Sequence, residues 1–166
     1  MSRAFVKEND LEHAGIDIPE RPISLETNYV TPNGLNQLKD SADKLEQDRQ
    51  KLTDTDDPII KQKKMQIERD LRYFANRLKS AILINPLNQS QSIVLFSAKV
   101  DVLNESAEKL QFKIVGEDEA DIKNNKISYL SPLAKTLIGS RVNDEVVWIK
   151  PSGQELLVIT HINYNQ

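Results

Sequence analysis

The fold of this chain is decided by residues 31–82, TPNGLNQLKDSADKLEQDRQKLTDTDDPIIKQKKMQIERDLRYFANRLKSAI. Apolar side chains recur there at alternating steps of three and four residues. They are Leu35, Leu38, Ala42, Leu45 and Leu52 in the first half, and Ile60, Ile67, Leu71, Phe74, Leu78 and Ala81 in the second. This spacing is typical of helices that pair along a narrow apolar seam. It predicts two antiparallel helices, a coiled-coil hairpin.

Both predicted helices have clear start signals. Thr31 can cap the first helix with its side-chain oxygen, and Pro32 loses no hydrogen bond at the first helical position. We expect this helix to run from Pro32 to about residue 52. Pro58 opens the second helix, with Asp56 or Asp57 as its cap. Each arm has about 20 residues, so at about 1.5 Å per residue the hairpin should project about 30 Å.

The corner between the helices carries three carboxylates, Asp54, Asp56 and Asp57. Helix capping accounts for one or two of them and leaves the third unexplained. Arg49 and Lys64 occupy seam positions near this corner, where an apolar residue is expected. The hairpin should therefore be tightest at its base and looser toward its tip.

The composition is that of a folded protein of one or two small domains, with 28% charged and 39% hydrophobic residues. A net charge of -3 does not indicate a nucleic-acid binder. The absence of cysteine excludes disulfides, thiolate metal sites and cysteine nucleophiles. The sequence has no apolar run typical of a signal peptide or of a transmembrane helix. We therefore expect a cytoplasmic protein without a membrane partner.

The segment before the hairpin, residues 1–28, is predicted to be an N-terminal arm. Pro19 and Pro22 break any regular period, and only Ile16, Ile18 and Ile23 could anchor it. We expect a poorly ordered tail. The alternative is a segment that packs along the hairpin or the following domain.

The segment after the hairpin begins with a linker, residues 85–92, and from residue 93 the apolar period changes to two. Alternation over residues 98–102 and 110–114 predicts two strands, residues 127–130 a third, and residues 146–149 with 156–162 a closing hairpin. Ser131 and Pro132 repeat the cap-plus-proline signal and predict one short helix ending at Gly139. The sequence therefore predicts an α+β protein: a helical hairpin, residues 29–84, then a small antiparallel sheet domain with one short helix, residues 93–166.

No catalytic residue set is indicated. The acidic stretch of residues 116–121, GEDEAD, lacks the ligand spacing of a calcium loop, and we expect it to be a solvated turn. His13 lies in the arm and His161 in the last strand, and no Ser-His-Asp order, phosphate loop or metal-ligand spacing accompanies them. We expect the protein not to be an enzyme.

Four motifs stand in order within about residues 29–164. They are Val30-Thr31-Pro32-x-Gly34-Leu35, Asp70-Leu71-Arg72-Tyr73-Phe74-x-x-Arg77-Leu78, Ile114-Val115-Gly116-x-Asp118-Glu119-Ala120-Asp121, and Ser131-Pro132-Leu133-Ala134 with Leu137, Gly139, Val142, Asp144 and Val146. Together these motifs resemble the GreA/GreB family of transcript-cleavage factors, GreB more than GreA.

This resemblance implies bacterial RNA polymerase as the partner. The protein would act as a monomer. An FKBP-like domain, residues 93–166, would dock at the rim of the polymerase secondary channel, and the coiled coil would enter the channel. In this family a D-x-x-E pair at the tip helps to hold Mg2+ in the polymerase active centre, which then hydrolyses the backtracked transcript. The spacing is met here by Asp54 and Asp57, with Asp56 as a substitute ligand. The Mg2+ would be shared with the polymerase, and no cofactor would belong to the protein itself.

The resemblance also places a basic face of the second helix beside the nascent RNA 3' end. Its residues are Lys61, Lys63, Lys64, Arg69 and Arg72. These side chains would contact RNA phosphates by charge alone.

Two alternative functions remain open. The first arm is several turns shorter than is usual in the family, which favours a regulator that occupies the channel without stimulating cleavage. A prolyl isomerase on the FKBP-like domain would need an aromatic-lined pocket. The available aromatic residues are Phe96, Phe112, Tyr129, Trp148 and Tyr164, and core packing explains them equally well.

Overall fold

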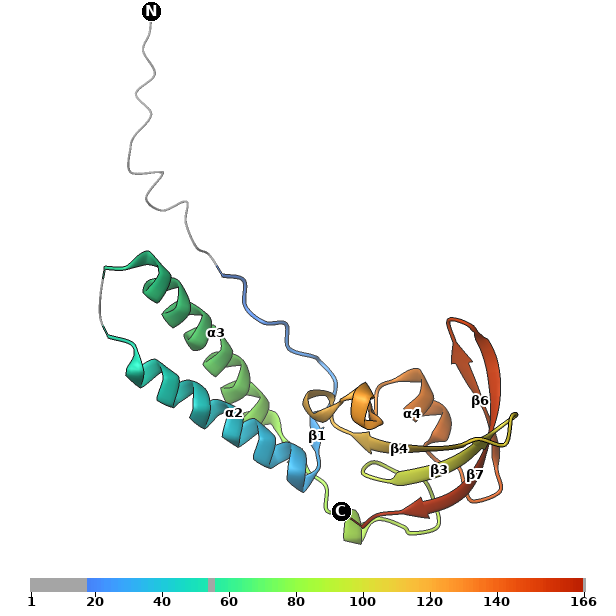
Figure 1. The fold of residues 1–166 in the computed structure, drawn as a ribbon. Helices are drawn as coiled ribbons and strands as arrows, with labels where there is room; N and C mark the ends of the chain where they lie inside the picture. Colours follow the sequence, from blue (N-terminus) through green and yellow to red (C-terminus); the bar gives the residue numbers. More distant parts are fainter. Residues whose placement is uncertain (1–17, 54–55, 166) are drawn as a thin grey trace, which may run out of the picture.

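The structure, a computed structural model, describes residues 18–53 and 56–165. A two-helix hairpin projects from a domain built on a curled five-stranded sheet (Figure 1). The predicted α+β fold is confirmed. None of the helices in the described residues is long and apolar enough to cross a membrane.

The hairpin consists of α2 (Pro32–Lys51) and α3 (Pro58–Ser80). Each begins with a side-chain cap followed by proline. The Thr31 hydroxyl accepts the Gly34 N–H at 2.9 Å, and an Asp57 carboxylate oxygen accepts the Ile59 N–H at 2.9 Å. Asp57, rather than Asp56, is therefore the cap of the second helix.

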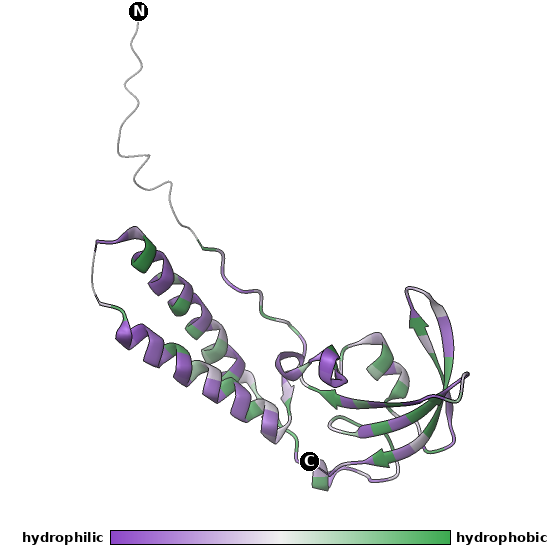
Figure 2. Ribbon diagram, in the orientation of Figure 1, coloured by the Kyte–Doolittle hydropathy of each residue, from purple (hydrophilic) through white to green (hydrophobic). Residues whose placement is uncertain are grey.

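The apolar seam is packed most tightly away from the tip. Leu38 and Ile67 are 2% and 6% exposed, whereas Leu52 and Ile60, the seam residues on either side of the corner, are only half-buried. Figure 2 shows hydrophilic residues over most of both helices, with the hydrophobic ones interspersed among them. The predicted loosening toward the tip is confirmed only in that both fully buried seam residues lie away from the corner; Leu35 and Leu78 near the base are also half-buried.

The base of the hairpin is closed by two short strands that the sequence pattern did not predict. β1 (Tyr29–Val30) pairs in parallel with β2 (Ile82–Leu83). Strands of two residues are too short to show a period of two, so only the tertiary structure defines them. A short 3-10 helix, η1 (Pro86–Asn88), then leads toward the sheet.

The sheet has the strand order β5-β4-β3-β7-β6. Its strands are β3 (Lys99–Asn104), β4 (Lys109–Val115), β5 (Lys126–Ser128), β6 (Glu145–Lys150) and β7 (Gly153–Asn163), with α4 (Pro132–Leu137) following β5. All neighbours are antiparallel, as predicted, except β4 and β5, which are parallel, so the sheet is mixed and not wholly antiparallel. Two short helices, η2 (Glu117–Glu119) and η3 (Ile122–Asn124), return the chain across the sheet end, so that β5 runs in the direction of β4.

One apolar core fills the concave side of this sheet. Its fully buried members include Val100, Val102, Ile114, Leu137, Leu157 and Ile159. The aromatic residues considered for an isomerase site are packed against this core. Phe112 meets Trp148 edge-on at 5.6 Å, and Phe96 and Tyr129 both contact Tyr29 at the hairpin base.

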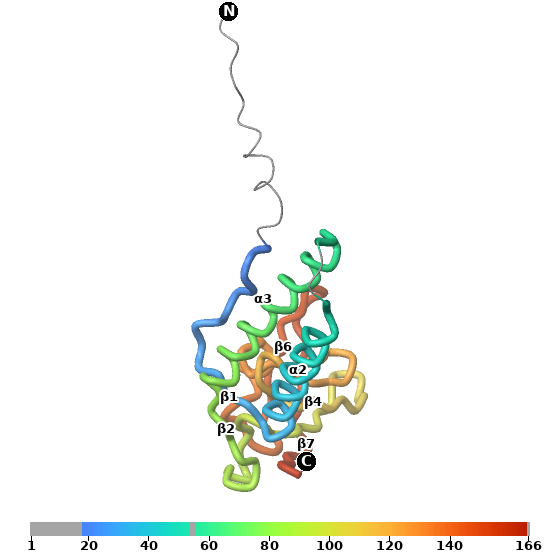
Figure 3. The backbone as a smooth tube through the Cα atoms, turned by 90° about the vertical axis from the view of Figure 1, so that its left-hand side faces the viewer, coloured from blue at the N-terminus to red at the C-terminus, as the bar shows by residue number. Residues whose placement is uncertain are grey.

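Residues 18–28 form an extended strap beside α3 (Figure 3). The Arg21 guanidinium lies over the Tyr73 ring at 3.7 Å from its centroid, and Glu20 forms an ion pair with Arg72. For these residues the alternative of packing along the hairpin is correct, and the poorly ordered tail is wrong. The rest of the predicted arm, residues 1–17, lies outside the described residues.

Candidate functional site: the hairpin tip and the joint at its base

The hairpin tip presents two described carboxylates to solvent. Asp56 is fully exposed and forms an ion pair with Lys61 at 3.0 Å. Asp57 is also exposed, and one of its oxygens caps α3. The predicted partner Asp54 lies outside the described residues. The structure therefore brings Asp56 and Asp57 together at the far end of α3, about 35 Å from its base at about 1.5 Å per residue.

These side chains suit a magnesium ion by chemistry but do not complete a site. Mg2+ prefers hard oxygen ligands such as carboxylates. Within residues 18–53 and 56–165, no group of three or more candidate ligands converges. The tip could therefore contribute ligands to an ion held mainly by another molecule.

The predicted basic face of α3 is largely paired within the protein. Lys61 binds Asp56, and two guanidinium nitrogens of Arg69 donate to Asp70 at 2.8 and 2.9 Å. Arg72 binds Glu20 of the strap.

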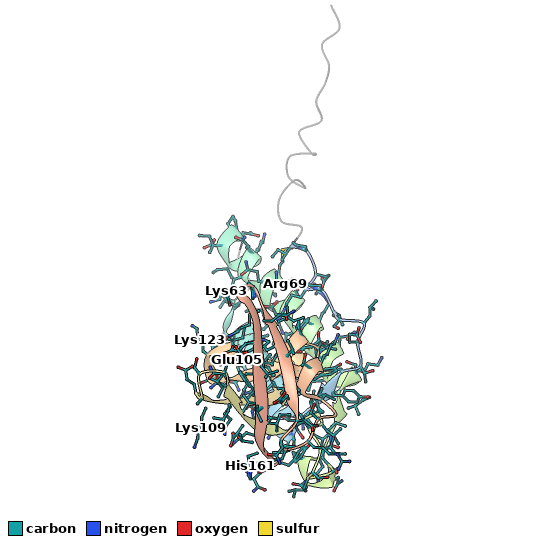
Figure 4. All side chains as sticks on the ribbon, turned by 90° about the vertical axis from the view of Figure 1, so that its right-hand side faces the viewer. Lys63, Arg69, Glu105, Lys109, Lys123 and His161 are labelled. Carbon is teal, nitrogen blue, oxygen red and sulfur yellow. The ribbon has the colours of Figure 1, made fainter. Side chains whose placement is uncertain are left out.

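The remaining two predicted basic residues are Lys63, which is exposed, and Lys64, which is half-buried. At 3.6 residues per turn, Lys63 points roughly opposite to Arg72. Hence the five residues do not form one continuous face. Figure 4 shows Lys63 and Arg69 at the hairpin end of the molecule, far from His161, which is exposed on the last strand.

A buried ion pair joins the base of the hairpin to the sheet domain. Arg77 of α3 is 2% exposed, and its Nε donates to Asp118 of η2 at 2.6 Å. The Tyr73 hydroxyl donates to the same carboxylate at 2.5 Å, and Glu117 lies 3.4 Å from the guanidinium. Because Tyr73 and Arg77 are one helical turn apart, α3 holds Asp118 from one face.

A second buried carboxylate, Glu119, binds the start of α2. It accepts hydrogen bonds from the Thr31 hydroxyl and, at 2.8 Å, from the Asn33 amide, and Lys126 lies 3.4 Å away. The prediction that residues 116–121 form a solvated turn is therefore wrong. The stretch is rich in acids because it supplies the carboxylates that fasten both helices. The helix partners of Asp118 and Glu119 lie 41 to 88 positions away in sequence.

We call these contacts of Asp118 and Glu119 with the two helices the joint. The joint shifts the pKa values of two of its residues. Burial and the hydrogen bond to Asp118 raise the pKa of Tyr73 to about 12. Burial alone would lower the pKa of Arg77, but the hydrogen bond and charge of Asp118 outweigh it and raise the pKa. Both shifts favour the protonated forms that bind Asp118.

The sheet domain also has an apolar groove of about 900 Å³. Its lining includes Leu110, Phe112, Pro132, Leu133 and Trp148. At its edge Ile149 is 68% exposed and Ile122 is 86% exposed. Exposed apolar concavities of this kind mark surfaces that bind other macromolecules. Trp148 itself is half-buried.

The chain was compared with known proteins. Residues 89–164 match the family model described as transcription elongation factor, GreA/GreB, C-term. Transcription elongation factor GreB of Neisseria meningitidis serogroup B is 35% identical over 159 residues, covering 86% of this chain and 98% of its own. GreA of Sphingopyxis alaskensis is 36% identical over 104 residues, covering 63% of this chain and 66% of its own.

Among solved structures, GreA factor homolog 1 of Thermus thermophilus is 24% identical, with a TM-score of 0.41. It covers 83% of this chain and 99% of its own. The identity with the Neisseria GreB extends over both the hairpin and the sheet domain, at nearly full length of that protein. The chain belongs to the GreA/GreB family of transcription elongation factors.

Proposed function

We propose that the protein binds bacterial RNA polymerase, inserts its hairpin into the secondary channel, and stimulates cleavage of backtracked transcripts. The observation that carries the proposal is the placement of Asp56 and Asp57, both exposed, at the end of a projecting hairpin. Such a tip can carry acidic side chains into a narrow channel. Acting on RNA polymerase, the protein would work in the cytoplasm.

The tip carboxylates would act on the metal of the polymerase, with Asp54 and Asp57 as the ligands and Asp56 as a substitute. Bound Mg2+ would activate the water that hydrolyses the transcript. The residues of this chain would supply oxygen ligands and orient them. Asp57 is suited to this role because its bond to the Ile59 N–H limits the motion of its carboxylate.

The basic residues of α3 would run beside the nascent RNA 3' end. Lys63 is exposed and could meet phosphates directly. Arg72 would first have to exchange Glu20 of the strap for a phosphate. Surface ion pairs contribute little stability, typically about 0–1 kcal/mol, so this exchange is inexpensive.

The apolar groove of the sheet domain is the surface available to anchor the protein on the polymerase. The joint at the hairpin base would then set the direction in which the tip points. Two independent sets of contacts, Asp118 with α3 and Glu119 with α2, resist rotation of the hairpin. A sheet domain docked on the polymerase would therefore fix the direction in which the hairpin projects.

The test is RNA shortening in stalled, backtracked polymerase complexes, with and without the protein. We expect the protein to produce shortened transcripts, and Ile149→Glu in the groove to weaken polymerase binding. Val142→Glu, at another exposed apolar residue outside the groove, is the matched control. Unshortened transcripts in the presence of bound protein would overturn the cleavage role.

A second function, regulation without cleavage, is favoured by the tip itself. The hairpin has arms of only 20 and 23 residues, and the substitute ligand Asp56 is already paired with Lys61. A protein of this kind would occupy the channel and compete with other factors. Binding to polymerase without RNA shortening is the result that this alternative predicts.

A further inference from the structure

Three lysines lie side by side on the outer face of the sheet, one on each of three neighbouring strands. Lys99 of β3 is the register partner of Lys113 of β4, which in turn is the partner of Lys126 of β5. Register partners project to the same face, and neighbouring strands are about 4.8 Å apart, so the row spans about 10 Å. The alternate residues Val100 and Ile114 are buried in the core, which directs the lysines outward.

This row is electrostatically unfavourable for the protein alone. Like charges directly opposite each other on neighbouring strands destabilise a sheet. Among the described residues, Lys126 has an ion pair with Glu119, but no carboxylate lies within ion-pair distance of Lys99 or Lys113. Burial lowers the pKa of Lys113; Glu119 opposes this shift, and the charges of Lys126 and Lys99 add to it.

The row lies in a concavity of about 290 Å³ whose other lining side chains are amides, Gln111, Asn124 and Asn125. The neighbouring carboxylates are already bonded: Asp101 accepts from Gln111 at 2.6 Å, and Asp121 accepts from Asn124 at 2.6 Å. Every side chain that lines the concavity carries N–H donors.

None of the residues lining this concavity is aromatic. Proteins that bind single-stranded nucleic acids generally offer aromatic side chains on which bases stack. A ligand here would therefore be held by its phosphates and not by its bases. The length of the row, about 10 Å, suits several linked negative charges better than a single ion.

We propose that the row of Lys99, Lys113 and Lys126 binds a chain of linked phosphates, such as pyrophosphate, tripolyphosphate or the phosphate tail of a nucleotide. The three ammonium groups would neutralise successive phosphates, and the amides would donate hydrogen bonds at the rim. The site lies on the sheet domain and uses none of the residues assigned to the tip, so it stands whether or not the protein stimulates cleavage.

The test is a calorimetric titration of the full chain with tripolyphosphate. The variant K99Q/K113Q removes two charges of the row and spares Lys126, which also supports the joint. The matched control K109Q/K123Q removes two exposed lysines of the same domain, which lie outside the concavity and are labelled in Figure 4. Thermal unfolding with and without tripolyphosphate reports binding independently.

We expect K99Q/K113Q to weaken tripolyphosphate binding at least tenfold and to lose the ligand-induced rise in Tm, while the control stays within about twofold of the natural protein. Without ligand, K99Q/K113Q should be at least as stable as the natural protein, because a like-charge contact is removed. Three results would overturn the proposal. They are no binding by the natural protein, equal losses in both variants, or an oligothymidylate without terminal phosphates that binds as tightly as tripolyphosphate.

Discussion

Neutralising Asp118 should loosen the joint between the hairpin and the sheet domain. In Asp118→Asn the shape of the side chain is kept, but the guanidinium of Arg77, which is 2% exposed, loses its charged partner at 2.6 Å. Breaking a buried ion pair from one side costs about 3–5 kcal/mol because a buried charge is left uncompensated. Asp118 itself is 14% exposed and Glu117 remains 3.4 Å away, so we expect about 3 kcal/mol.

The measurement is equilibrium unfolding in urea followed by circular dichroism, with Glu117→Gln as the matched control. Glu117 is more exposed and more distant, so its neutralisation should cost less than about 1 kcal/mol. Arg77→Met together with Asp118→Asn removes both charges, and the double variant should be less destabilised than the sum of the single ones by about 1–3 kcal/mol. Additive effects, or a cost for Asp118→Asn as small as the control's, would refute the buried ion pair as the element that holds the joint.

Three further predictions concern the apolar seam of the hairpin, the close packing at the hairpin base, and the dependence of stability on pH. Leu38→Ala should cost about 2–4 kcal/mol in urea unfolding and Leu52→Ala about 1 kcal/mol, because only the first site is fully buried; equal costs would contradict the loosening toward the tip. Gly116→Ala should cost about 1–3 kcal/mol, because its new Cβ would lie 2.5 Å from a backbone oxygen of β1; an unchanged Tm would contradict this close approach. Since the folded pKa of Tyr73 is raised to about 12, its contribution to stability is complete below pH 10 and is lost as the pH rises through 12. Tyr73→Phe should flatten this part of the profile of stability against pH, and an unchanged slope would refute the link.

The elements could be predicted from the sequence wherever the signal is local. Periodicity predicted the seam, and capping residues followed by proline predicted the starts of α2, α3 and α4 correctly. The period of two predicted the strands of the sheet. These signals depend on neighbours a few residues apart, which a single sequence displays directly.

The joint could not be predicted because its partners are distant in sequence. Residues 116–121 have the composition of a solvated turn, and nothing local distinguishes Asp118 and Glu119 from exposed acids. Arg77 is adjacent to the seam residue Leu78 and one turn after Tyr73, but Lys79 is equally close to Leu78 and is exposed. Proximity to the seam therefore does not identify Arg77 as a buried charge or reveal its partner.

The sequence predicted a cluster of acidic residues at the tip, and the structure describes two of them, Asp56 and Asp57. Asp57 is the helix cap, as one of the two options anticipated, and Asp56 pairs with Lys61. Whether these carboxylates reach a metal depends on the partner, which the sequence of this chain does not contain. The function of Asp54, Asp56 and Asp57 therefore stays a prediction.

The most direct measurement of the central claim is the rate at which backtracked transcripts are cleaved in the presence of the tip variant D54A/D57A. The control D40A/D43A removes two exposed carboxylates from α2, nearer the hairpin base, and keeps the tip intact. We predict that the natural protein and the control accelerate cleavage equally, and that D54A/D57A binds polymerase with unchanged affinity but gives no acceleration. Cleavage by D54A/D57A at the natural rate would contradict the assignment of these aspartates to the transcript-cleaving metal.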